Sequence, residues 1–205
     1  MLKRHAAGSL LGGFLASRGW VAQGAFVLVT LVVAVLAVPE LHGVPFSQDR
    51  SVFRLVWLSC VPGALASGFL APPGEIECSF PVRPLGLVRF RWVVSLALFP
   101  VAVHAAAQVM LGGFQPWVSA WFLRNHLLML SISLIAGSVA WPSVAWAPSC
   151  VYVLVCWFLG TRDAFGGAWW WAVPNHLPDR PVGWVLAVVA FGWAAARQLS
   201  KPARC

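Results

Sequence analysis

Charged residues are scarce in this chain, and the densest group of them falls in one polar stretch. Glu75 and Glu77 are two of only six acidic residues, and Arg83, Arg89 and Arg91 follow them. Carboxylates at this spacing complement the exposed N–H groups at the start of a helix, and they also pair with basic side chains of a partner. The stretch is therefore either a solvated helix start or a binding surface for another protein, and the arginines are also candidate anchors for lipid headgroups.

Prolines and a glycine bracket the two acids. Pro72 and Pro73 end the apolar segment before them, and Gly74 allows the backbone to turn. Pro81 and Pro84 then limit a helix that starts at the acids to about two turns. Such a short helix is not stable alone in water. It needs a surface to dock on, and we predict that this surface belongs to a partner protein.

The composition indicates an integral membrane protein. Of the 205 residues, 60% are hydrophobic and 10% are charged, and the mean hydropathy is +0.80. A soluble core of this size cannot bury so many apolar side chains. The net charge of +8 comes from basic residues scattered between apolar segments, which indicates topology signals and argues against nucleic-acid binding.

The sequence contains no pattern for catalysis, metal binding or nucleotide binding. Its five cysteines form no CxxC pair, and neither an HExxH motif nor a GxxxxGK[ST] phosphate loop occurs. All six acids fall in predicted loops, which disfavours a membrane-embedded enzyme. We expect no catalytic residue, no metal site and no cofactor bound by this chain. If ATP is used, another chain binds it.

Hydropathy predicts one all-α membrane domain, residues 1–205, with six transmembrane helices. The predicted spans are approximately 21–38, 55–71, 92–111, 125–141, 147–160 and 182–196. The fourth span is started at Asn125 because an arginine deep in hydrocarbon is costly, and Trp117–Leu123 is then expected at the interface. Residues 161–180 are too polar to cross and too aromatic to be solvated throughout, which predicts a partly re-entrant or interfacial hairpin.

The basic residues also predict the orientation. With the N-terminus inside, inner segments hold nine lysines and arginines and outer segments hold five. Both termini, and the acidic stretch, are therefore expected on the cytoplasmic side of the cell membrane. Residues 1–19 fit an amphipathic interfacial helix or a basic lead into the first span, and a cleaved signal peptide is the third option.

Three ionisable side chains in or beside the apolar segments are candidates for a transport pathway. His104 lies within the third span, where such a residue is a functional candidate by default. The alternative is that its imidazole bonds a carbonyl across a close helix contact. Arg124 and His126 either line the outer mouth of a pathway or extend to the external headgroups.

The layout resembles the membrane subunit of ABC exporters of the ABC type 2 permease family. The family's first cytoplasmic loop carries a G-x-[LI]-E pattern followed by P-V. The matching residues are Gly74-Glu75-Ile76-Glu77 and Pro81-Val82-Arg83. The resemblance implies a short cytoplasmic coupling helix between spans two and three, which a P-loop ATPase carrying ATP and Mg²⁺ would contact. The residues expected at that contact are Glu75, Glu77, Pro81 and Arg83.

The resemblance implies a permease subunit without enzymatic activity of its own, which exports a hydrophobic or amphipathic substrate. A second copy or a related permease subunit would complete the pathway within the lipid bilayer. Two alternatives stay open. One is a non-transporting membrane interaction or immunity protein, and the other is the substrate-capture subunit of an importer, which reaches an ATPase through a scaffold protein.

Overall fold

The computed structural model describes residues 20–37, 48–66, 82–111, 113–139, 144–160, 168–176 and 179–200. Within these residues the regular elements are helical, as predicted. They are α2 (Trp20–Leu36), α3 (Gln48–Leu65), α5 (Val82–Leu111), α6 (Pro116–Val139), α7 (Ala147–Leu159), the 3₁₀ turn η4 (Val173–Asn175) and α8 (Pro181–Ser200).

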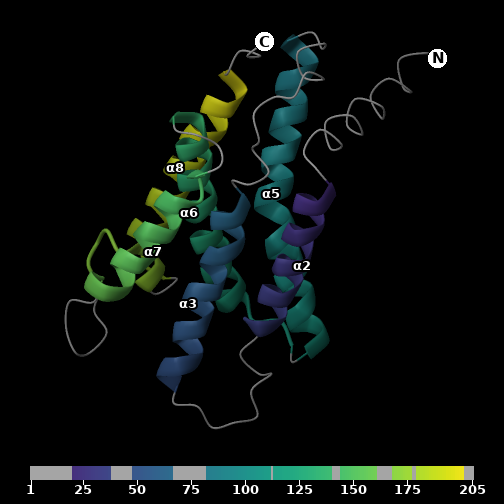
Figure 1. The fold of residues 1–205 in the computed structure, drawn as a ribbon. Coiled ribbons are helices and arrows are strands. Elements are labelled where there is room, and N and C mark those ends of the chain that lie inside the picture. Colours follow the sequence, from purple (N-terminus) through teal and green to yellow (C-terminus); the bar gives the residue numbers. More distant parts are fainter. Residues whose placement is uncertain are drawn as a thin grey trace.

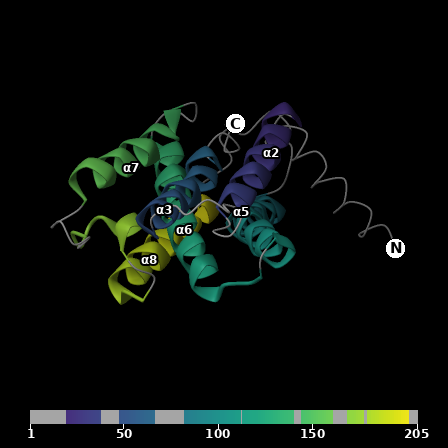
Figure 2. The same cartoon turned by 90° about the horizontal axis from the view of Figure 1, so that it is seen from below.

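Helix α6 is the centre of the arrangement (Figures 1 and 2). It packs most extensively against α3 and α8, and it also contacts α5 and α7. Helix α2 packs on α5 and α3, so that α2 and α7 lie at opposite ends of the molecule when it is seen from below (Figure 2). The side chains of α6 therefore meet neighbours on nearly every side.

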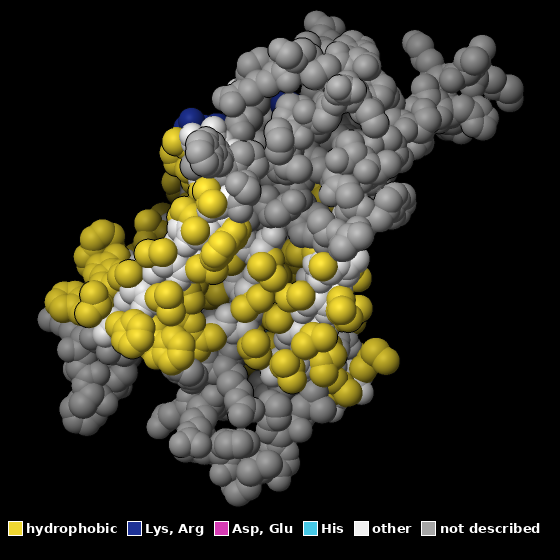
Figure 3. Space-filling view, viewed as in Figure 1, with side chains coloured by type: hydrophobic (Ala, Val, Ile, Leu, Met, Phe, Trp, Pro, Cys, Tyr) yellow, Lys and Arg dark blue, Asp and Glu magenta, His cyan; other side chains and the backbone are white. Residues whose placement is uncertain are grey.

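The distribution of side chains is the reverse of that in a soluble protein. Leu28, Phe158 and Val189 are 63%, 75% and 64% exposed, whereas Arg124 and Asn125 are completely buried. On the face shown in Figure 3, apolar side chains cover most of the described surface. Exposed apolar side chains are what a lipid environment demands, and the polar groups buried inside must find partners within the protein.

Three helical segments of the described residues are long and apolar enough to cross a membrane: Arg89–Leu111, Pro116–Val139 and Pro181–Ser200. Helix α7 and residues Gln23–Leu36 of α2 are apolar but shorter. The structure thus agrees with membrane association and with an all-helical fold.

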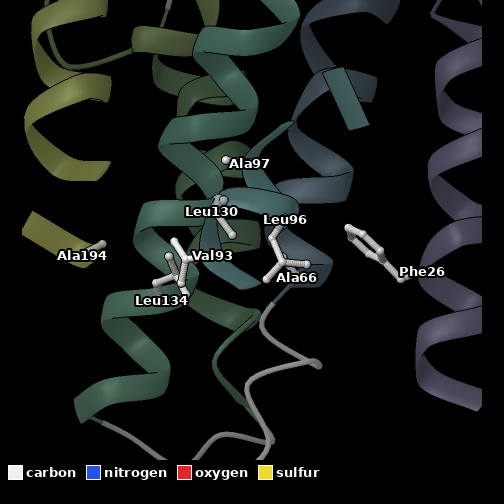
Figure 4. Packing of buried hydrophobic residues seen from close by; sticks show 8 residues of the cluster. All are labelled: Phe26, Ala66, Val93, Leu96, Ala97, Leu130, Leu134 and Ala194. Atoms are coloured by element: carbon white, nitrogen blue, oxygen red, sulfur yellow. The ribbon is translucent and has the colours of Figure 1, made fainter. Parts of the chain in front are cut away.

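A cluster of buried apolar side chains joins four helices around the middle of α6 (Figure 4). Its members are Phe26, Ala66, Val93, Leu96, Ala97, Leu130, Leu134 and Ala194. Phe26 extends from α2 toward Leu96, and Ala194 approaches from α8 on the opposite side. Gly63 permits the close contact of α3 with α6, since a Cβ there would lie 2.6 Å from the His126 carbonyl oxygen.

Three helices begin well before the predicted spans. Helix α6 begins at Pro116 and continues through Asn125, so Trp117–Leu123 is part of the same helix. Helix α3 begins at Gln48, inside a predicted loop, and ends at Leu65.

Helix α5 begins at Val82, ten residues before the predicted start of the third span. Pro84, which was predicted to end an earlier helix, lies in its first turn. A missing N–H costs nothing at that position, because the first N–H groups of a helix have no partner within it.

Candidate functional site

Helix α6 directs polar groups to two sides within six residues. Trp121, Arg124 and Asn125 have the i, i+3, i+4 spacing that places side chains on one face. Phe122 and His126, four residues apart, share another face. Each face organises one polar cluster inside the bundle.

The first face forms what we call the arginine cluster: Ser59, Trp121, Arg124, Asn125 and the backbone carbonyls that they bind. Arg124 is completely buried. Its Nη2 donates to the carbonyl oxygens of Val173 at 3.0 Å and His176 at 2.6 Å. Its Nη2 and Nε also lie 3.2 and 3.3 Å from Asn125 Oδ1. One guanidinium thus binds both ends of the irregular segment around η4.

The neighbours of Arg124 bind the carbonyl between those two ends. Trp121 Nε1 donates to the Pro174 oxygen at 3.1 Å. Asn125 Nδ2 donates to Ser59 Oγ at 3.0 Å, and it lies 3.5 Å from the same Pro174 oxygen. Buried carbonyls outside a regular helix have no ladder partner, so these side chains supply the donors that an apolar surrounding lacks.

Helix α7 holds the same segment from the other side. Tyr152 Oη donates to the Trp171 oxygen at 2.6 Å, and Asn175 Nδ2 donates to the Cys156 oxygen at 2.8 Å. The 3₁₀ turn contacts α3, α7 and α8. Residues 168–176, which belong to the hairpin predicted to be partly re-entrant or interfacial, therefore pack against the helices of the bundle.

The second face forms what we call the histidine stack: His104, Phe122 and His126. The rings of His104 and Phe122 are stacked, with centroids 4.3 Å apart and planes at 13°. Phe122 and His126 follow, with centroids 6.3 Å apart and planes at 23°. Both histidines are completely buried. The stack joins α5 to α6 through aromatic contact.

Hydrogen bonds fix the tautomer of His104. Gln108 Oε1 accepts from the backbone N–H of Gln115 at 2.8 Å, so the amide Nε2 of Gln108 is the donor to His104 Nε2, also at 2.8 Å. The opposite ring nitrogen, Nδ1, then carries the proton and donates to the Ala34 oxygen at 3.2 Å. This confirms the predicted bond from His104 to a carbonyl across a helix contact.

His126 completes the backbone bonding of α5. Pro100 lies inside that helix and has no N–H, so the carbonyl of Leu96, four residues earlier, loses its usual helical partner. His126 Nε2 donates to this oxygen at 2.9 Å. Its Nδ1 is buried without a hydrogen-bond partner among the described residues.

The predicted partner contacts are mostly outside the described part of the chain. Glu75, Glu77 and Pro81 lie outside the described residues. Arg83 is the second residue of α5, and its side chain is also outside the described part.

The predicted pathway residues are all in the bundle. The expectation that Arg124 and His126 extend to headgroups is wrong, since both are 0% exposed and bond inward. Arginine can be held there because its five donors match several carbonyls at once. Whether His104, Arg124 and His126 line a pathway stays a prediction.

Four members of these clusters were not singled out as site residues from the sequence, and neither was Gln108, which bonds to His104. The four are Ser59, Trp121, Phe122 and Asn125. Gln108 had a usable signal, because a polar residue four positions after a histidine in an apolar helix lies on the same face. Asn125 and Trp121 had the corresponding spacing to each other. Among the described residues, no group of three or more His, Cys, Asp or Glu side chains is placed to hold a metal ion.

Comparisons of the chain with protein-family models, with curated proteins and with solved structures found no match.

Proposed function

We propose that this chain is the permease subunit of an ATP-driven exporter of the ABC type 2 permease family, with six spans and both termini in the cytoplasm. It would move a hydrophobic or amphipathic substrate out of the cell, together with a separate ATPase and a second permease subunit. The observation that carries the proposal is helix α5. It is continuous for 30 residues, which is longer than the roughly 20 residues that a membrane span requires.

The length of α5 supports a mechanical role. At 1.5 Å per residue the helix is about 45 Å long, whereas the hydrocarbon core is about 30 Å thick. About 15 Å of helix is therefore left over, and it fits outside the hydrocarbon at the N-terminal end. Pro81 directly precedes this end, and Arg83 is its second residue. A partner bound at Glu75 and Glu77 would thus act at the N-terminal end of one continuous helix.

Further along, the same helix is bonded to buried polar side chains. Helix α5 carries His104 and the Leu96 carbonyl, both of which bond to neighbouring helices. A shift of α5 along its axis would move both contacts at once. In this proposal the histidine stack is the contact that rearranges when the pathway opens.

Purification from the native membrane tests the complex. The expected result is a P-loop ATPase recovered with the chain in stoichiometric amount. Its absence under conditions that preserve known membrane complexes would contradict the proposal. A complex that contains the ATPase only through a third membrane protein would favour the importer alternative.

A charge-removal variant tests the coupling role. We expect Glu75→Ala with Glu77→Ala to insert normally but to uncouple ATP hydrolysis from export in reconstituted vesicles. The matched control is Glu40→Ala, which removes an acid from a predicted outer loop. Export that stays coupled in the double variant would remove the role assigned to these residues.

One observation favours a second candidate, a non-transporting membrane interaction protein. The arginine cluster binds the segment 168–176 with donors from α6 and α7, which is typical of a fixed scaffold. This alternative predicts that no ATPase copurifies, and that Glu75 and Glu77 tolerate substitution.

A further inference from the structure

A hollow of about 240 Å³ lies between the N-terminal half of α2 and the middle of α5. Its lining residues are Gln23, Phe26 and Val27 of α2 and Trp92, Ser95, Leu96 and Phe99 of α5. The rings of Phe26 and Phe99 lie across it with centroids 6.5 Å apart. The lining is predominantly apolar.

The hollow opens toward the surface of the bundle that lipid would cover. Its α5 wall lies within the span Arg89–Leu111, and Val27 and Phe99 remain 41% and 36% exposed. Its predominantly apolar lining offers water few hydrogen-bond partners. In a bilayer the available apolar occupant is an acyl chain.

The end of the hollow nearest the start of α5 is positively charged. Arg91 is exposed, and its carbonyl accepts from Ser95 Oγ, a lining residue, at 2.8 Å. Arg89 precedes Trp92 and Leu96 by three and seven residues, so it lies on the same helix face as the lining. Basic side chains at the end of a span lie at headgroup depth and attract anionic lipid.

We propose that this hollow binds one anionic phospholipid, with an acyl chain between α2 and α5 and the phosphate at Arg91 and Arg89. A neutral lipid would match the apolar part and not the charge. A second copy of the chain would match the apolar part without supplying an anion. The inference does not depend on the proposed export function.

Native mass spectrometry of the full chain in detergent tests the charge preference. The delipidated protein is titrated with phosphatidylglycerol and, separately, with phosphatidylcholine of the same acyl chains. We expect one retained phosphatidylglycerol, and retention weakened about fivefold by Arg91→Gln, the effect of about 1 kcal/mol for one basic residue. Arg91→Lys should keep it, and Arg197→Gln, an exposed arginine on α8, is the control.

Val27→Trp tests the hollow itself, because the indole ring would fill it. We expect retention of both lipids to fall, while Val185→Trp, at a 60% exposed position of α8, leaves it unchanged. If Val27→Trp does not fold, the smaller Ser95→Leu serves the same test. Equal retention of the two lipids, lipid binding unaffected by filling the hollow, or a lipid-free dimer would each overturn the proposal.

Discussion

The arginine cluster and the histidine stack start from the same six residues of α6 but bind different kinds of backbone. Arg124 and its neighbours donate to carbonyls of an irregular segment, residues 173–176. The two histidines donate to carbonyls that belong to regular helices, those of Ala34 and Leu96. The Val173 oxygen also accepts from the backbone N–H of His176 at 3.1 Å. By contrast, the Leu96 carbonyl has lost its helical donor to Pro100, and Ala34 lies in the last turn of α2.

The contribution of a buried donor to stability depends on which other donors its acceptor has. An acceptor that becomes unsatisfied costs about 1–3 kcal/mol, and more for bonds to charged groups. Arg124 donates to two carbonyls from a charged group, whereas each histidine donates to one, His126 at 2.9 Å and His104 at 3.2 Å. The loss of stability on substitution should therefore decrease in the order Arg124, His126, His104.

Removal of the guanidinium should have the largest effect. Arg124→Met leaves the carbonyls of Val173 and His176 without their strongest donor, and two charge-assisted bonds contribute about 1.5–3 kcal/mol each. We expect a free energy of unfolding lower by about 3–5 kcal/mol. The measurement is thermal unfolding of the purified protein in detergent, together with protease cleavage within residues 168–176.

Arg197→Met is the matched control, because Arg197 is exposed and its guanidinium lies 5.8 Å from the centre of the Trp193 ring. Its free energy of unfolding should be close to that of the natural sequence. Equal shifts in the two variants would mean that the arginine cluster does not hold the irregular segment.

The bond from His126 should have an intermediate effect, and it depends on Pro100. His126→Leu leaves the Leu96 carbonyl unsatisfied, at a cost of about 1–3 kcal/mol. Pro100→Ala restores a backbone N–H to that carbonyl, so the same His126→Leu change should cost clearly less in the alanine background. The measurement is a double-mutant cycle by thermal unfolding. Equal costs in both backgrounds would show that His126 does not substitute for the missing N–H.

The sequence predicts well those helices whose bounds follow from hydropathy alone. The observed bounds of α7 and α8 lie close to the predicted spans, because uninterrupted apolar runs end there at prolines, glycines or charges. The His104 bond could be predicted because alanines beside it indicate a close helix contact. For these features, neighbours in the sequence carry enough information.

The course of α6 through Arg124 could not be predicted in this way. An arginine without partners is costly in lipid, but the carbonyl acceptors that lower this cost for Arg124 lie 49 and 52 residues later in the chain. The start of α5 was missed for a different reason. A proline disrupts a helix at an interior position but is tolerated in the first turn. Pro84 alone therefore does not show whether one helix ends there or another begins.

The smallest loss of stability is expected on substitution of His104. His104→Phe keeps a ring against Phe122 and removes the bond to the Ala34 carbonyl, in the last turn of α2. It also leaves the Gln108 amide without its acceptor. The double variant with Gln108→Met removes that amide as well. Cross-helix bonds in membrane proteins average about 0.6 kcal/mol, so we expect the double variant to lose about 1 kcal/mol or less.

Thermal unfolding of the single and double variants gives this loss. Because the fold should persist, the double variant also separates structure from transport: reduced export at unchanged stability would assign His104 to the pathway. A loss as large as that of Arg124→Met would instead show that the bonds of the histidine stack stabilise the fold as much as those of the arginine cluster.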